Sequence, residues 1–374
     1  MQSTFTFGRV AGIPIGINWT WIPVFFLIAW SWAVEVFPSE NPGHSDAAYA
    51  AMSVVATALF FTSLLLHELG HALQAQRERM EIEGITLWLF GGVAKFKGSF
   101  PSAGAEFRIA VAGPAVSLAL GGGLTLLAWL AGLPDVVDGV AAWLGYINLF
   151  LLVFNLLPAL PLDGGRVFRS ALWYFQGDFG WATRIAAAAG RGFGYLFVAG
   201  GVALVFFTGA WGGLWLAFIG FFLVQAAAAE DRYGVARRAL AGLRVRDLLV
   251  ADPVTVRPDA TLAEFMDDVV WRTRYTTYPV TDNGSAVGLL PFRCVAEVPR
   301  REWETRTVRD CMLPREEVPV VAPDDPLIDA AAELSQGKIN RALVLDGERL
   351  VGLLSATDVA RALEVRGLRV RRRK

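Results

Sequence analysis

Residues 47–73 read AAYAAMSVVATALFFTSLLLHELGHAL, a run with no charged side chain before Glu68. About 20 apolar residues are enough for a helix to cross a bilayer. On such a helix His67 and His71 lie one turn apart on one face, with Glu68 beside them. Two histidines at this spacing can bind one metal ion, and the glutamate can accept a proton from metal-bound water. The stretch therefore predicts a metal site inside a membrane helix.

Further apolar runs surround this one. They are Ala11–Val34, Ile109–Leu133, Gly139–Leu162 and Gly192–Ala229, the last divided in two by a turn at Thr208–Gly213. Six spans in the first 230 residues argue against buried core helices of a soluble protein. We expect a membrane domain over residues 1–232.

The charged residues concentrate after this domain. The net charge of −1 is therefore an average over an apolar N-terminal part and a charged C-terminal part, and it indicates no particular partner. We expect no direct contact with nucleic acid. Two cysteines, Cys294 and Cys311, do not make a disulfide framework and suit a reducing cytosol.

Lys and Arg residues fall on one side of the predicted spans. The loops Glu35–Asp46 and Pro134–Asp138 contain none, whereas the opposite loops contain many, among them Arg77, Arg79, Arg108, Arg166, Arg169, Arg184 and Arg232. Cytoplasmic loops carry such an excess. The pattern predicts cytosolic N- and C-termini, and we expect a prokaryotic cell (inner) membrane.

A tetrahedral zinc site in a hydrolase needs a third protein ligand and one open position. His44 lies in a loop on the far side and is a poor candidate. Asp163 is better, at the end of Asn155-Leu-Leu-Pro158-Ala-Leu-Pro161-Leu-Asp163-Gly-Gly, which we place at the cytosolic end of the fourth span. Two alternatives stay open: Asp163 could only cap a helix that begins at Gly164, and the two histidines could bond to neighbouring helices.

The His67-Glu68-Leu-Gly-His71 motif, followed by Asn155, Pro158 and Pro161-Leu-Asp163-Gly164, resembles the site-2 protease family of intramembrane zinc metalloproteases. The resemblance extends over most of residues 1–230, including Gly12–Trp19 and Ala112-Gly113-Pro114. It implies one Zn²⁺ per chain with His67, His71 and Asp163 as ligands and Glu68 as the general base. It also implies that Asn155 and Pro158 position the substrate, although Asn155 could instead bond between helices. Ser117 departs from the family, because many relatives carry asparagine there.

Residues 85–96, ITLWLFGGVAKF, have strand-like composition and a Gly-Gly break. They predict a hairpin or sheet edge, which could bind an unwound substrate as an added strand. A plain amphipathic connector is the alternative.

After a connector at residues 233–244, two similar units follow at 245–304 and 305–366. Val245-Arg-Asp247 recurs as Val308-Arg-Asp310, and each unit ends in a Val-Gly-Leu-Leu strand. They resemble a tandem pair of CBS domains, which commonly bind adenine nucleotides. In that family a hydroxyl residue and an acid three positions later hold a ribose.

Ser355 and Asp358 keep this pattern in the second copy, whereas Pro291 and Cys294 lose it in the first. We therefore expect at most one ordinary site, for ATP, ADP or AMP. A purely structural or dimerising pair is the alternative, and the basic tail at 367–374 is expected to be solvated.

Taken together, we expect a multi-domain protein: a polytopic α-helical membrane domain of six spans with a small β element, and a cytosolic α/β CBS module. The expected function is zinc-dependent cleavage of a protein substrate within or near a transmembrane segment, modulated by nucleotide. The substrate would be a single-span membrane protein, such as a membrane-tethered transcription regulator, and the CBS domains could form a homodimer. The alternatives are an inactive metal-binding scaffold and a CBS-gated transporter.

Overall fold

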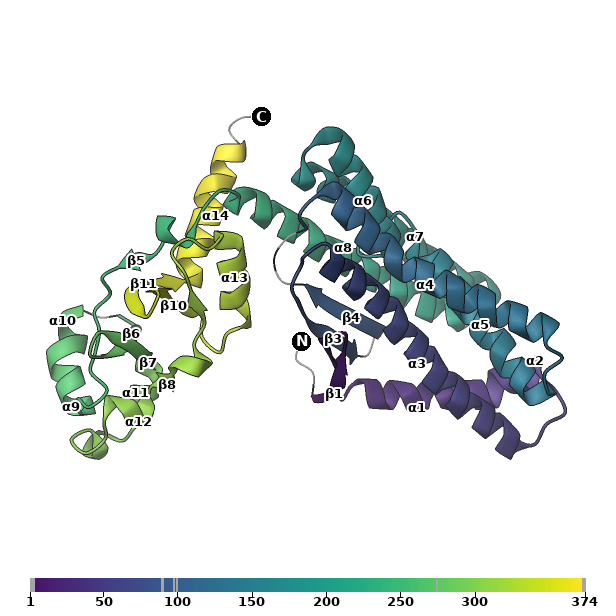
Figure 1. The fold of residues 1–374 in the computed structure, drawn as a ribbon, viewed down its shortest axis with the longest axis horizontal. Coiled ribbons are helices and arrows are strands. Elements are labelled where there is room, and N and C mark those ends of the chain that lie inside the picture. Colours follow the sequence, from purple (N-terminus) through teal and green to yellow (C-terminus); the bar gives the residue numbers. More distant parts are fainter. Residues whose placement is uncertain (1–3, 89–90, 97, 99, 274, 372–374) are drawn as a thin grey trace. The chain divides into compact units, whose positions relative to one another are not determined.

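The computed structural model describes residues 4–88, 91–96, 98, 100–273 and 275–371. Contacts within the chain divide it into two compact units, Met1–Gly234 and Val235–Lys374. The first unit consists of long helices and a small sheet, and the second alternates short helices and strands (Figure 1).

The first unit contains the following described elements: β1 (Phe5–Val10), β2 (Ile13–Ile17), α1 (Trp21–Ser31), η1 (Trp32–Val36), α2 (Phe37–Glu40), α3 (Asp46–Arg77), β3 (Ile82–Trp88), β4 (Gly91–Phe96), α4 (Ala103–Leu130), α5 (Asp135–Asn155), α6 (Asp163–Gln176), α7 (Phe179–Thr208) and α8 (Gly212–Leu240). Six helical stretches among the described residues are long and apolar enough to cross a membrane: Trp21–Glu40, α3, α4, α5, α7 and α8. The prediction of six spans is confirmed.

Polar residues just before several spans start the helices by capping their free backbone N–H groups. Ser45 accepts a hydrogen bond from the Ala48 amide at 3.3 Å, Ser102 from the Ala105 amide at 3.1 Å, and Asp178 from the Trp181 amide at 3.0 Å. The predicted turn between the last two spans is also present, since α7 ends at Thr208 and α8 begins at Gly212.

Helices α3, α4 and α5 pack side by side and form the centre of the membrane unit (Figure 1). Near the start of α3, Tyr49, Met52 and Ala56 are buried against Val140 and Leu144 of α5. Further along, Gly70 of α3 lies so close to Ala112 of α4 that an added Cβ would sit 3.0 Å from the Ala112 carbonyl oxygen. This close packing brings the part of α3 that carries His67 and His71 against α4.

The small sheet has four strands in the order β1-β2-β3-β4, in which β2 and β3 run parallel and the other pairs antiparallel. β3 and β4 form the predicted hairpin, and residues 89 and 90, between the two strands in sequence, lie outside the described residues. The expected start of the first span at Ala11 is wrong. Residues 13–17 form strand β2, which pairs with β3, so the helix begins at Trp21.

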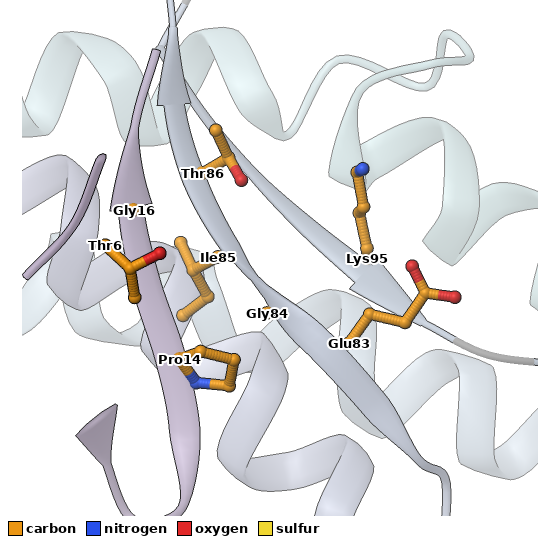
Figure 2. Close-up of a pocket in the computed structure, with 8 residues that line it drawn as sticks. All are labelled: Thr6, Pro14, Gly16, Glu83, Gly84, Ile85, Thr86 and Lys95. Carbon is orange, nitrogen blue, oxygen red and sulfur yellow. The ribbon is translucent and has the colours of Figure 1, made fainter. Parts of the chain in front are cut away.

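One face of the sheet carries a hollow of about 190 Å³ (Figure 2). Gly16 of β2 and Gly84 of β3 line the hollow without side chains, and the side chains of Glu83 and Lys95 lie at one side of it. Its lining residues differ from those of the larger cavity described below. The hollow is therefore separate from the candidate metal centre.

The second unit contains the following described elements: η2 (Val245–Asp247), β5 (Val250–Ala251), α9 (Leu262–Glu264), η3 (Phe265–Val270), α10 (Trp271–Thr273), β6 (Thr277–Asp282), β7 (Ser285–Pro291), α11 (Phe292–Ala296), η4 (Arg300–Glu302), α12 (Val308–Cys311), β8 (Leu313–Pro314), η5 (Arg315–Glu317), β9 (Val320–Val321), α13 (Leu327–Gln336), β10 (Arg341–Asp346), β11 (Arg349–Ser355) and α14 (Ala356–Arg371). Residues 372–374 of the expected basic tail lie outside the described part.

The two copies of the repeat exchange short strands. β5 of the first copy pairs with β11 of the second, and β8 of the second pairs with β7 of the first in the same way. Three clusters of buried apolar residues form among the described residues, around Leu290 and Tyr278, around Leu354 and Val344, and between the two copies around Leu289 and Leu343. The predicted α/β module with internal two-fold similarity is confirmed. Most of the expected connector is helical, because α8 continues to Leu240.

Candidate metal centre

Three buried side chains from two helices meet in the membrane unit. His67 and His71 lie one turn apart on α3, and Asp163 is the first residue of α6. The Asp163 Oδ2 atom is 3.1 Å from His67 Nε2 and 3.2 Å from His71 Nε2. The two Nε2 atoms are 3.1 Å apart. Three donor atoms therefore form a nearly equilateral triangle.

This triangle fits a tetrahedral metal ion. Zinc binds imidazole nitrogen and carboxylate oxygen at about 2.0–2.2 Å, which places tetrahedral ligand atoms roughly 3.3 Å from one another. The three side chains belong to residues that are only 6%, 3% and 8% exposed, so their polar atoms have little access to water. Ionisable groups at membrane depth are costly without a partner. The donor set and its spacing thus fit zinc with one position left open for water or substrate.

The outer nitrogens of both imidazoles have partners that orient the rings. His71 Nδ1 lies 2.6 Å from the Ile109 carbonyl oxygen, and His67 Nδ1 lies 2.9 Å from Ser117 Oγ, both on α4. A carbonyl only accepts, so His71 Nδ1 carries the proton and its Nε2 keeps a lone pair for a metal. The sequence showed Ser117 only as a departure from the family and gave it no role. In the folded chain the Ser117 hydroxyl nevertheless reaches the ring of His67.

Asp163 does not sit at the end of the fourth span, where the sequence places it. Helix α5 ends at Asn155, and residues 156–162 form a loop that leads into α6. Gly164 and Gly165 are necessary there, because an added Cβ would lie 2.2 Å from the Leu156 oxygen or 2.3 Å from the Ala159 carbonyl carbon. The Asp163 carboxylate contacts both histidines, so helix capping alone does not account for it.

Glu68 lies next to the ligands and against the sheet. Its Oε2 atom accepts a hydrogen bond from the Ala94 amide of β4 at 3.2 Å. Strand β4 can approach Glu68 this closely because residue 92 is glycine. A Cβ added at Gly92 would lie 2.4 Å from Glu68 Cγ. The edge strand β4 therefore faces the glutamate directly.

A cavity of about 430 Å³ opens beside the triangle. Among its lining residues are the three candidate ligands, Glu68, Trp88, Asn155, Pro161 and Arg166, together with residues of β4 and an apolar face of α8. The structure thus brings Asn155 to the site. Pro158 is exposed in the loop after α5 and is absent from this lining, and His44 lies before the start of α3, where its amide bonds to Tyr49.

Arg166 and Arg169, read from the sequence as loop residues, belong to helix α6. Arg169 is buried and donates to Glu106 of α4 through Nε and Nη2, and to Glu230 of α8 at 3.2 Å. The segment 163–176 is too polar to read as a span, so its packed position could not be found from hydropathy. The ion pair joins α6 to α4 and α8, and α6 carries Asp163 at its start.

The second unit has a cavity of about 230 Å³ at the predicted nucleotide residues. Ser355 and Asp358 line it, and the Ser355 hydroxyl donates to Asp358 at 2.5 Å. Arg341, Tyr275 and Thr276 line it as well, and Arg341 donates to Thr276 Oγ1 at 3.0 Å. A hydroxyl, a carboxylate, a cation and an aromatic ring are therefore present in one cavity. The corresponding residues of the first copy, at positions 291 and 294, are not part of this lining.

Gly113 of α4 gives a direct test of the metal centre. A Cβ at this position would lie 2.3 Å from His71 Nε2 and 2.6 Å from His67 Nε2. Gly113→Ala should therefore displace the imidazoles and reduce the zinc content from about one per chain to a small fraction. Gly122→Ala on the same helix meets nothing within 4 Å and should leave it unchanged. Equal zinc content in both purified variants would contradict this assignment of the site.

Comparison with protein-family models gives two matches. Residues 55–140 and 133–199 match the model of peptidase family M50. Residues 245–299 and 308–365 match the CBS domain model. The first match includes both histidines and Asp163, and the second covers the two repeat units.

Similar proteins match over nearly the whole chain. Rip3 of Mycobacterium tuberculosis is 38% identical, over 98% of this chain and 94% of that protein. The zinc metalloprotease MJ0392 of Methanocaldococcus jannaschii is 30% identical, over 96% of this chain and 95% of that protein. Among solved structures, a site-2 protease from Methanocaldococcus jannaschii shows 29% identity and a TM-score of 0.41, over 61% of this chain and 95% of the other. From the family models and the relatives, the chain belongs to peptidase family M50 and is a membrane zinc metalloprotease with a C-terminal pair of CBS domains.

Proposed function

We propose that this protein hydrolyses a peptide bond within or near the transmembrane segment of a substrate protein, with His67, His71 and Asp163 as zinc ligands and Glu68 as the general base. The observation that carries the proposal is the triangle of donor atoms at 3.1–3.2 Å, beside Glu68 in a cavity of the membrane unit. A zinc ion bound there would polarise the peptide carbonyl and make a water molecule more acidic.

Glu68 supplies the proton transfers. Its carboxylate accepts a proton from the attacking water as the new C–O bond forms. It then gives the proton to the leaving nitrogen as the C–N bond breaks, so the products are a carboxylic acid and an amine, which become a carboxylate and an ammonium ion once the second proton of the water moves to the amine. The Ala94 amide holds one carboxylate oxygen at 3.2 Å and so fixes the orientation of the base. Asn155 lines the same cavity, which supports the proposal that its side chain bonds the substrate backbone.

We propose single-span membrane proteins as the substrate class, for example a membrane-tethered transcription regulator. Apolar residues of α8, among them Trp215, Phe218 and Phe222, line the cavity and suit an apolar segment. We also propose that both termini are cytosolic, as the Lys and Arg distribution predicts.

Glu68→Gln tests the proteolytic function. The amide keeps the size of the side chain but cannot accept the proton, so cleavage of a single-span model substrate in detergent should fall by at least about 100-fold. Zinc content should stay near one per chain, because the substitution removes no proposed ligand. Metal analysis and gel-based cleavage of wild type and variant measure both quantities.

Three results would contradict the proposal. Cleavage by the Glu68→Gln variant at the wild-type rate would show that Glu68 is not the general base. Zinc binding without cleavage by the wild type, across several single-span substrates, would favour a metal-binding scaffold. Transport that survives the substitution would instead favour a CBS-gated transporter.

The free edge of β4 is the proposed binding place of the unwound substrate. Within the described residues β4 pairs only with β3, and its outward Ala94 amide already faces Glu68. A substrate strand added along this edge would bring its carbonyl groups next to the base. A helix must open in this way before water can reach its peptide bond.

Ala94→Pro tests the edge, because proline has no N–H to offer a substrate or Glu68. Cleavage should fall by about tenfold or more, with zinc retained. Ala94→Ser keeps the amide and is the control. If the proline variant cleaves the model substrate as fast as the serine variant, the added-strand proposal is wrong.

We further propose that an adenine nucleotide binds at Ser355 and Asp358 and modulates proteolysis. The cavity with its hydroxyl, carboxylate and Arg341 supports this. Asp358→Ala should weaken binding of ATP, ADP or AMP by about tenfold or more, because a charge-assisted hydrogen bond is lost. The cleavage rate without nucleotide should not change.

Calorimetry and cleavage assays with and without each nucleotide make this measurement on the full-length protein. Cys294→Ala, at the corresponding position of the first copy, is the matched control. Nucleotide affinity and response that are the same in Asp358→Ala as in wild type would contradict the proposal, and a purely structural or dimerising CBS pair would then be the better account.

A further inference from the structure

Arg166 lines the cavity beside the metal centre and has no role in the function proposed so far. It lies on α6, three residues after Asp163, so the two side chains project from the same side of the helix. Both line the cavity together with Glu68. A guanidinium group therefore stands close to the place where the peptide bond is cleaved.

The Nε donor of Arg166 is uncommitted. It is buried and has no hydrogen-bond partner among the described residues. Buried donors are almost always paired, and leaving one unpaired is costly. Arg169, one turn further along, differs completely, since Nε, Nη1 and Nη2 all bond to Glu106 or Glu230. Within the part of the chain that the structure describes, Arg166 thus lines the cavity with a guanidinium group whose buried Nε has no acceptor.

Acidic side chains around Arg166 stabilise its positive charge. The guanidinium interacts electrostatically with Glu230, Asp163, Glu106 and Glu68. Glu106 and Glu230 already have direct partners in Arg169, and Asp163 contacts the histidines. Glu106 Oε2 is buried without a partner among the described residues. Arg166 could therefore serve only to balance the charge of Glu106. An experiment has to distinguish this structural role from a direct role in the reaction.

We propose that Arg166 is a further catalytic residue that donates hydrogen bonds to the carbonyl oxygen of the scissile peptide bond. This inference rests on the proposed proteolytic function. When water adds to the carbonyl carbon, the oxygen gains negative charge, and that charge is returned when the C–N bond breaks. Donors that are fixed in advance in an apolar cavity stabilise such charge strongly. The planar fork of a guanidinium suits the task, whereas the point charge of lysine suits it less well.

The experiment compares Arg166→Gln and Arg166→Lys with wild type in full-length protein. Zinc content, kcat and KM for the single-span substrate, and the affinity for a phosphonate peptide are measured. The phosphonate carries tetrahedral anionic oxygens and resembles the transition state. Arg184→Gln on α7, a half-buried arginine outside the cavity lining, is the matched control.

We expect Arg166→Gln to keep about one zinc per chain and a KM within about threefold of wild type, with kcat and phosphonate affinity each lower by about 100-fold. Arg166→Lys should lose at least about tenfold in both, because it keeps the charge but not the fork. The Arg184→Gln control should match wild type.

Other outcomes would overturn the inference. Wild-type kcat in Arg166→Gln, or full recovery in Arg166→Lys, would leave only the counter-charge role. Loss of zinc or of thermal stability in parallel with activity would point to the structural role as well. A wild type that holds zinc but neither cleaves substrate nor binds the phosphonate would contradict the proposed function, and this inference with it.

Discussion

The membrane unit is organised by the need to place two imidazoles and a carboxylate inside an apolar helix bundle. Ionisable side chains at this depth cost roughly 2.5 kcal/mol or more each unless they have partners. His67, His71 and Asp163 contact one another through a triangle of atoms 3.1–3.2 Å apart, close to the distance between ligand atoms of a tetrahedral zinc ion. The remaining architecture holds this triangle together.

Each neighbouring element contributes one part of that support. Helix α4 comes close at Gly113 and supplies the Ile109 carbonyl and the Ser117 hydroxyl to the rings. Helix α6 begins at Asp163 and is held to α4 and α8 by the buried Arg169 ion pairs. The edge of β4 reaches Glu68 through the Ala94 amide. The candidate ligands and Glu68 on α3, Asp163 on α6 and the edge of β4 thus meet in one cavity.

Sequence reasoning succeeded where a short-range rule decides the structure. The six spans follow from apolar length, the His67–His71 pair from helical spacing, and the hairpin at 85–96 from strand composition with a glycine break. The tandem CBS units follow from the repeated Val-Arg-Asp motif. Sequence reasoning failed where contacts between distant segments decide the structure. Residues 13–17 read as membrane helix but pair with β3, and α6 reads as a charged loop although Arg169 is buried in it. The role of Ser117 could not be found, because only the folded position of α4 brings it to His67.

The central claim is that His67, His71 and Asp163 bind a zinc ion in an otherwise apolar bundle. X-ray absorption at the zinc edge of the purified full-length protein tests it most directly. We expect about one zinc per chain with four nitrogen and oxygen ligands at about 2.0–2.2 Å, an imidazole signal, and loss of this spectrum in Asp163→Ala. Absence of zinc, or a zinc spectrum that Asp163→Ala and His71→Ala both leave unchanged, would show that these residues are not the zinc ligands.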